Sequence, residues 1–111
     1  MKKEIKRGEV YLVNFDPTIG GEIKKTRPAV VVSTDKANPH LNRVIVIPLT
    51  SNIEKLYPAE AKVILKKKES KAMADQIRTI SKQRIIKKIG KLDSKDMKKI
   101  EDVIKLVLEL F

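Results

Sequence analysis

The sequence predicts a small, mostly antiparallel β-domain that is closed by one helix at its C-terminal end. Short runs of strand-forming residues, separated by turn residues, occupy most of the chain. Apolar residues recur at helical spacing only near the C-terminal end. Because 41% of the 111 residues are hydrophobic, the chain can fill a core, and we expect a single domain spanning residues 1–111.

Six runs of residues are predicted to form strands. The first ends at Asp16-Pro17, and the second begins at Pro28, where a strand needs no backbone donor. Pro48 is predicted to end the third, and a polar loop follows over residues 50–58. Several short strands in so small a chain favour a barrel-like sheet. The six runs are residues 9–15, 28–33, 43–49, 59–65, 73–80 and 85–92.

The C-terminal helix carries an apolar stripe. Asp93 or Ser94 can cap its N-terminus, because a short polar side chain can accept a hydrogen bond from the free amides of the first turn. The stripe must pack against the sheet or a partner, and we interpret it as core. Its members are Met97, Ile100, Val103, Ile104, Val107, Leu108 and Phe111.

The composition excludes several kinds of site. Without cysteine the chain has no disulfide, no thiolate zinc site and no cysteine nucleophile. One histidine, His40, excludes a multi-histidine metal site and a histidine pair that shares acid and base work; we read His40 as a surface residue. No phosphate-binding glycine motif and no acidic metal cage occurs, so no metal or cofactor is expected.

The charge points to a polyanionic partner. Lysine and arginine number 25 against 14 acidic residues, giving a net charge of +11, and residues 66–68 form the densest basic run. Charge alone leaves RNA, DNA, an acidic protein and a solvated lysine-rich surface open. The basic N-terminus is not followed by an apolar segment, so we expect a soluble cytoplasmic protein without membrane association.

Several sequence blocks resemble MazF/PemK-type toxins. Their order, their spacing and the chain length agree with that family over nearly the whole chain. A lone Arg-Pro-Ala-Val-Val would be a weak signal, but the ordered blocks together are specific. The blocks are RGEVY (7–11), FDPTIGGE (15–22), TRPAVVVS (26–33), PLTS (48–51) and DQIRTISKQR (75–84).

The resemblance implies a small SH3-like antiparallel barrel with a C-terminal helix, the fold that MazF, PemK and CcdB toxins share, working as a homodimer. It further implies a toxin that cleaves single-stranded mRNA at short sequences without a metal. The ribose 2′-hydroxyl would attack the phosphate, leaving a 2′,3′-cyclic phosphate and a 5′-hydroxyl. A cognate acidic, MazE-like antitoxin would cover the active groove.

The resemblance also implies four catalytic residues. Arg27 matches the catalytic arginine, whose planar fork suits phosphate oxygens. Thr50 matches the catalytic threonine, a hydroxyl donor to the scissile phosphate. Asp75 and Glu22 both match carboxylates linked to activity, and we prefer Asp75 as the general base.

RNA recognition is expected from a further set of polar residues. Gln76 offers a donor and acceptors to an unstacked base, whereas Arg78 either binds RNA or supports the fold or the dimer. The complete expected set is Gln76, Arg78, Thr79, Lys24, Lys25, Ser51 and Asn52.

Two rival functions fit the same blocks. Gyrase-poisoning toxins related to CcdB share the fold but bind a protein, and the Thr-Arg-Pro and Pro-Leu-Thr-Ser sequences of this chain favour the nuclease. A catalytically degenerate member would act only as a module that binds RNA or an antitoxin.

Overall fold

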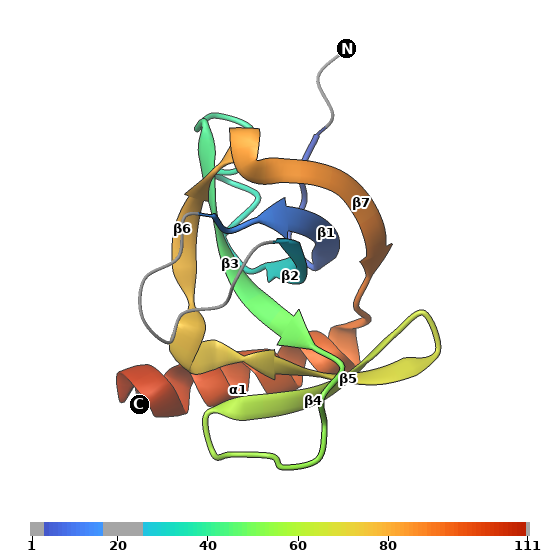
Figure 1. Ribbon diagram of the computed structural model, residues 1–111. Helices are drawn as coiled ribbons and strands as arrows, with labels where there is room; N and C mark the ends of the chain where they lie inside the picture. The colour runs from blue at the N-terminus through green and yellow to red at the C-terminus, as the bar shows by residue number, and fades with distance from the viewer. Residues whose placement is uncertain (1–3, 17–25, 111) are drawn as a thin grey trace.

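The computed structural model describes residues 4–16 and 26–110, which form one curled antiparallel sheet and a helix lying across it (Figure 1). Two single-turn 3-10 helices, η1 (Ala74–Gln76) and η2 (Lys82–Arg84), separate the later strands. The mostly-β class predicted from the sequence is confirmed. The strands are β1 (Glu9–Asn14), β2 (Thr26–Val31), β3 (Arg43–Thr50), β4 (Glu60–Leu65), β5 (Lys68–Met73), β6 (Arg78–Ser81) and β7 (Ile85–Lys91), and the helix is α1 (Ser94–Leu108).

β3 is the central strand and pairs with three others. The order across the sheet is β4-β5-β3-β2-β1-β7, and β6 lies off this path, paired with β3. The first half of β3 pairs with β6, whereas its last two residues, Leu49 and Thr50, pair with β5. Because β6 and β5 pair one after the other along the same edge of β3, the sheet curls. Thr50 lies where the β4–β5 hairpin joins β3.

The single fifth strand predicted over residues 73–80 is wrong. The chain forms β5 and β6 there, with η1 between them. Leu49 pairs with Ala72 and Val46 pairs with Arg78, so the chain opposite β3 is longer than β3 by the residues of η1. Strand propensity does not predict this interruption between β5 and β6, because the pairing of both strands with the distant strand β3 determines where it falls.

β3 also continues through Pro48, where the sequence predicts its end. Val46 is the last residue that pairs with β6, and Leu49 is the first that pairs with β5. Pro48 therefore lies where the ladder on that side is interrupted, and its missing N–H costs no bond there. As a result Thr50 belongs to a strand rather than to the following loop, and β2 likewise begins at Thr26, before the predicted start.

Alternate residues of the central strands supply two hydrophobic cores, one on each face of the sheet. In β2, Val30 joins the core beneath α1, whereas Ala29 and Val31 join the other core. Met97 and Ile100 of α1 complete the first core. Among the described residues the second core contains none from α1, so the curl of the sheet encloses it.

α1 begins at the predicted cap and is tied to the edge strand β4. The carboxylate of Asp93 accepts a hydrogen bond from the amide of Asp96 at 2.8 Å. The buried carboxylate of Asp96 accepts one from the amide of Ile64 in β4, also at 2.8 Å, which satisfies a donor that an edge strand leaves open. At the other end Leu108 is exposed, and Phe111 lies outside the described residues.

Candidate active site

Arg27 and Thr50, predicted from distant parts of the sequence, lie at the same end of neighbouring strands. The pairing of β2 with β3 ends at Ala29 and Pro48, and Arg27 and Thr50 each lie two residues beyond that pair. Both side chains are half-buried. The antiparallel pairing therefore places a guanidinium and a hydroxyl together at one end of the sheet.

These two residues line a pocket of about 450 Å³, which we call the Arg27–Thr50 pocket. The ends of β2 and β3 form one wall and the β4–β5 hairpin forms the other. Three cationic side chains and one carboxylate line it, with several hydroxyls between them. The lining residues are Thr26, Arg27, Pro28, Leu49, Thr50, Ser51, Leu65, Lys66, Lys68, Glu69 and Ser70.

The Arg27 guanidinium has an unused donor. Its Nε is buried and has no hydrogen-bond partner among the described residues. A buried donor without a partner costs about 1–3 kcal/mol, so a fold retains one only where something else supplies the acceptor. An anion with several oxygens, such as a phosphate, would satisfy it.

The Thr50 hydroxyl is oriented by the turn that follows it. Its Oγ1 accepts a hydrogen bond from the amide of Asn52 at 3.2 Å, which leaves the hydroxyl proton free to donate. The side chain of Asn52 accepts in turn from the amide of Glu54 at 3.3 Å. Ser51 and Asn52 are both exposed beside the pocket mouth, and only Ser51 lines the pocket.

The structure does not bring Asp75 into this pocket. Asp75 lies exposed on η1, four residues beyond Lys71, which pairs with Thr50. Asp75 is not among the residues that line the Arg27–Thr50 pocket. The only carboxylate among the described residues that line the pocket is Glu69, which the sequence reading missed, although its place next to the lysine run 66–68 could have indicated it.

The expected recognition residues at η1 and β6 form a separate polar edge. The amide Nε2 of Gln76 donates to the Met73 sulfur at 3.8 Å, so this side chain folds back on its own turn. The Arg78 guanidinium lies over the Phe15 ring, 5.4 Å from its centroid, and Thr79 is exposed. The Arg78 contact favours a structural role for that residue.

Three predicted residues, Glu22, Lys24 and Lys25, lie outside the described residues. Among those described, no group of histidine, aspartate and glutamate side chains could hold a metal ion. No helix in residues 4–16 or 26–110 is long and apolar enough to cross a membrane.

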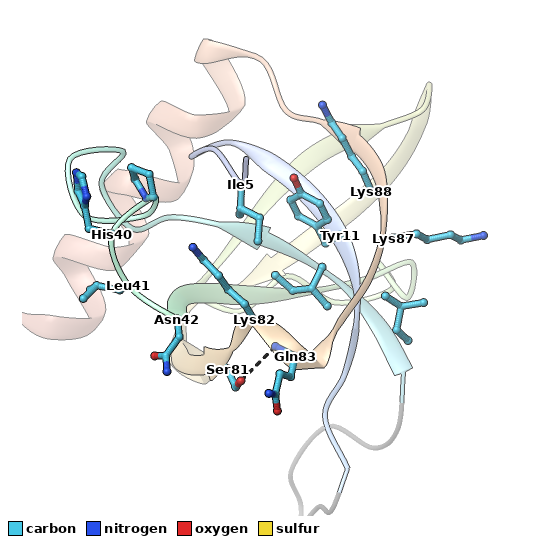
Figure 2. A pocket seen from close by; sticks show the side chains of 13 residues that line it. Ile5, Tyr11, His40, Leu41, Asn42, Ser81, Lys82, Gln83, Lys87 and Lys88 are labelled. Carbon is cyan, nitrogen blue, oxygen red and sulfur yellow. Dashed lines mark hydrogen bonds between the residues drawn. The ribbon is translucent and has the colours of Figure 1, made fainter. Parts of the chain in front are cut away.

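A second hollow, the β7 hollow, contains none of the predicted site residues. It holds about 570 Å³ between η2, β7 and the connection after β2, with His40 exposed at its rim (Figure 2). Its lining residues are Ile5, Tyr11, Pro39, His40, Leu41, Asn42, Ser81, Lys82, Gln83, Ile85, Ile86, Lys87 and Lys88.

A polar cluster borders the β7 hollow, in which Glu9 and Tyr11 are buried and Lys88 is exposed. The Lys88 ammonium lies 2.6 Å from Oε2 of Glu9, and the Tyr11 hydroxyl donates to Oε1 at 2.7 Å. Burial works to raise the pKa of Glu9, but hydrogen bonds from Lys88, Tyr11 and the Lys6 amide outweigh it and lower that pKa. Burial, together with the Glu9 carboxylate, raises the pKa of Tyr11, so this phenol stays protonated and donates.

The chain is similar to toxins and ribonucleases of known family. A family model described as PemK-like, MazF-like toxin of type II toxin–antitoxin system matches residues 6–108. Endoribonuclease MazF9 of Mycobacterium tuberculosis is 37% identical over 118 residues, which cover 96% of this chain and 98% of that protein. The structure of MazF from Deinococcus radiodurans aligns with a TM-score of 0.86 at 22% identity, covering 98% of this chain and 100% of that one. An endoribonuclease from Mycobacterial species, solved in complex with its cognate antitoxin, aligns with a TM-score of 0.80 at 22% identity over 96% of both chains.

Proposed function

Because the chain belongs to the family of PemK-like, MazF-like toxins of type II toxin–antitoxin systems, we propose that it is an endoribonuclease that cleaves single-stranded mRNA at short sequences without a metal. The observation that carries this proposal is the Arg27–Thr50 pocket. Its buried Arg27 donor has no acceptor among the described residues, and Thr50, whose hydroxyl proton is left to donate, lines the same pocket.

The reaction uses the substrate's own nucleophile. The 2′-hydroxyl loses its proton to a base and attacks the adjacent phosphorus, and the bond from phosphorus to the 5′-oxygen breaks. The products are a 2′,3′-cyclic phosphate and a 5′-hydroxyl, which takes up a proton. Arg27 stabilises the negative charge of the pentacoordinate phosphate, and Thr50 donates a hydrogen bond to a phosphate oxygen.

The general base is a carboxylate, Asp75 or Glu22, and Asp75 is preferred. A carboxylate serves as a base near neutral pH only when its surroundings raise its pKa. Asp75 lies exposed on η1 outside the Arg27–Thr50 pocket, so this role requires that the bound RNA brings its 2′-hydroxyl to η1. Asp75→Asn is expected to lower kcat and change the pH profile, and an unchanged profile would transfer the role to Glu22.

RNA is bound by residues on both sides of the pocket. Ser51 and Asn52 follow Thr50 directly, and Gln76 and Thr79 lie on the polar edge of η1 and β6. Lys24 and Lys25 hold backbone phosphates in the proposed complex, and Arg78 supports the fold through its contact with Phe15.

The proposed physiological state is a cytoplasmic homodimer that a cognate antitoxin inhibits. Antitoxin complexes are known for a structural relative of this chain. An acidic antitoxin segment suits a protein with a net charge of +11, since opposite charges favour association.

The test is cleavage of a long mixed-sequence RNA in EDTA, followed by sequencing of the 5′-hydroxyl ends. We expect discrete cleavage by the wild type and strongly reduced cleavage by Arg27→Ala or Thr50→Val, with the folded circular-dichroism signal retained. RNA left intact by the wild type overturns the nuclease. Trapping of gyrase on DNA would then identify a CcdB-like toxin, and salt-dependent RNA binding without cleavage a degenerate module.

A further inference from the structure

We propose that the β4–β5 hairpin is a second phosphate-binding element of this groove, in which Lys66 and Lys68 bind RNA backbone phosphates next to the scissile one. The proposal rests on the proposed function, because it places the substrate chain across the Arg27–Thr50 pocket. It assigns a task to two lysines of the basic run 66–68, for which the charge alone leaves both a polyanionic partner and a solvated surface open.

The hairpin lies beside the reaction site. Lys66 and Lys68 line the same pocket as Arg27 and Thr50. Leu65 pairs with Lys68, so the connection between the strands is the two residues Lys66 and Lys67. In Figure 1 this hairpin projects past the end of the sheet, next to the point where β3 ends.

The lysines at the turn of the hairpin have no ion-pair partner in the described part of the chain, although other charges of its two strands are paired. Lys66, Lys67 and Lys68 form no ion pair with any described residue, whereas Lys71 and Lys88 are paired with glutamates. The one carboxylate in the pocket, Glu69, is paired with Lys62 at 3.0 Å. The pocket therefore presents Arg27, Lys66 and Lys68 to a ligand with little opposing charge.

The backbone of the hairpin is strained at the two lysines. Lys66 and Lys67 have φ angles of 50° and 66°, in the left-handed region. Two-residue hairpin turns of this kind favour Asn-Gly because both positions need positive φ. Lysine at both positions costs stability, and backbone strain of this kind concentrates at ligand sites. This turn therefore carries two cationic residues at positions where Asn-Gly would be less strained.

The turn end of the hairpin also packs against β7. A Cβ built on Gly90 of β7 would meet Cδ1 of Leu65 at 3.1 Å and Cγ of Lys66 at 3.9 Å. The glycine therefore lets the hairpin lie close against β7. This packing fixes the backbone from which Lys66 and Lys68 extend, so both flexible side chains start from the wall of the Arg27–Thr50 pocket.

The chemistry favours phosphate as the ligand. An ammonium group is a compact point charge that binds phosphate oxygens from several directions, whereas Arg27 offers a planar fork for the scissile group. Contacts to backbone phosphates position the strand and add affinity without reading bases. The hairpin is therefore expected to change how tightly RNA binds, and to leave the cleavage sequence unchanged.

The test compares two double variants that remove equal charge. Lys66→Gln/Lys68→Gln removes the proposed contacts, and Lys36→Gln/Lys105→Gln removes two exposed lysines that form no ion pair with a described residue. The probe is a single-stranded RNA with a 2′-deoxyribose at the cleaved nucleotide, which blocks the reaction. Its Kd is measured at increasing KCl concentrations.

The salt dependence gives the expected result. Each lost phosphate contact reduces the slope of log K against log salt by about 0.7 for a single strand. Lys66→Gln/Lys68→Gln is expected to weaken binding several-fold and to reduce the slope by about 1.4, while the matched control keeps the wild-type slope. The distribution of 5′-hydroxyl ends on cleavable RNA is expected to stay the same.

Two outcomes overturn the proposal for the hairpin and leave the proposed ribonuclease function intact. If the wild type cleaves RNA but the hairpin variant keeps the slope of the control, these lysines do not bind phosphate. If only the affinity for a polyglutamate peptide falls, they serve an acidic protein partner instead. Absence of cleavage by the wild type contradicts the proposed function itself and is recognised in the first experiment.

Discussion

The Arg27–Thr50 pocket and the β7 hollow are both basic cavities of similar size, but their charges are used differently. In the β7 hollow Lys88 is paired with Glu9, and Lys82 donates to the carbonyl of Asn38. In the Arg27–Thr50 pocket the buried Arg27 donor and the hairpin lysines have no such partner among the described residues. The comparison shows that a net charge of +11 does not locate a binding site. Exposed Lys87 of the β7 hollow also forms no ion pair with a described residue, so the feature that distinguishes the Arg27–Thr50 pocket is the buried Arg27 donor without an acceptor in the described part of the chain.

The largest expected effect comes from the pocket. Arg27→Ala removes the fork that stabilises the pentacoordinate phosphate and is expected to lower kcat about 10²–10³-fold, the usual cost of one such donor. Arg27→Lys retains a charge but loses the fork, so it should recover only part of the rate. Single-turnover cleavage measures both. Full activity of Arg27→Ala would remove this residue from the reaction.

A buried lysine outside the pocket is expected to act on stability instead. The Lys71 ammonium lies 2.9 Å from Glu60 and donates to the carbonyl of Lys55 at 2.7 Å, with both charged side chains nearly enclosed. Lys71→Met leaves the largely buried Glu60 carboxylate without its cationic partner and should lower the free energy of unfolding by about 3 kcal/mol. The matched variant Lys62→Met breaks an exposed pair and should cost at most about 1 kcal/mol. Equal costs in urea unfolding would contradict this distinction.

The pH dependence of stability tests the interaction of Glu9 with Lys88 and Tyr11 beside the β7 hollow. Because the pKa of Glu9 is lowered from 4.5 in the fold, its contribution is complete above the unfolded pKa and is lost as the pH falls through the folded pKa. Glu9→Gln should cost about 2 kcal/mol at pH 7, since hydrogen bonds to a charged group are lost. The variant should also lose less stability than the wild type on acidification. Parallel curves of unfolding free energy against pH would place the titration elsewhere.

The smallest expected effect is a gain in stability on replacing Lys67 with glycine. Lys67 has positive φ but does not line the pocket. Lys67→Gly removes left-handed strain of about 1–2 kcal/mol and adds about 1 kcal/mol of chain entropy cost, so a net gain of roughly 0.5 kcal/mol is expected. A higher Tm with an unchanged salt dependence of RNA binding supports this. A lower Tm would mean that the Lys67 side chain makes a stabilising contact.

Much of the fold follows from local signals. The period of the apolar residues and the cap at Asp93 define α1, because both act within a few residues of chain. Strands β1, β2, β3, β4 and β7 lie within two residues of their predicted limits. The ordered sequence blocks indicate the family, and Arg27 and Thr50 come from two of them.

The tertiary structure decided the rest. Pairing with opposite ends of β3 splits residues 73–80 into β5, η1 and β6, and the same split leaves Asp75 outside the Arg27–Thr50 pocket. Which lysines remain unpaired also depends on contacts between distant segments, such as Lys88 with Glu9. The amino-acid sequence by itself determined the elements and the reactive residue types. Only the long-range register determined which of those residues meet, because pairing partners and ion pairs far apart in the chain leave no local pattern.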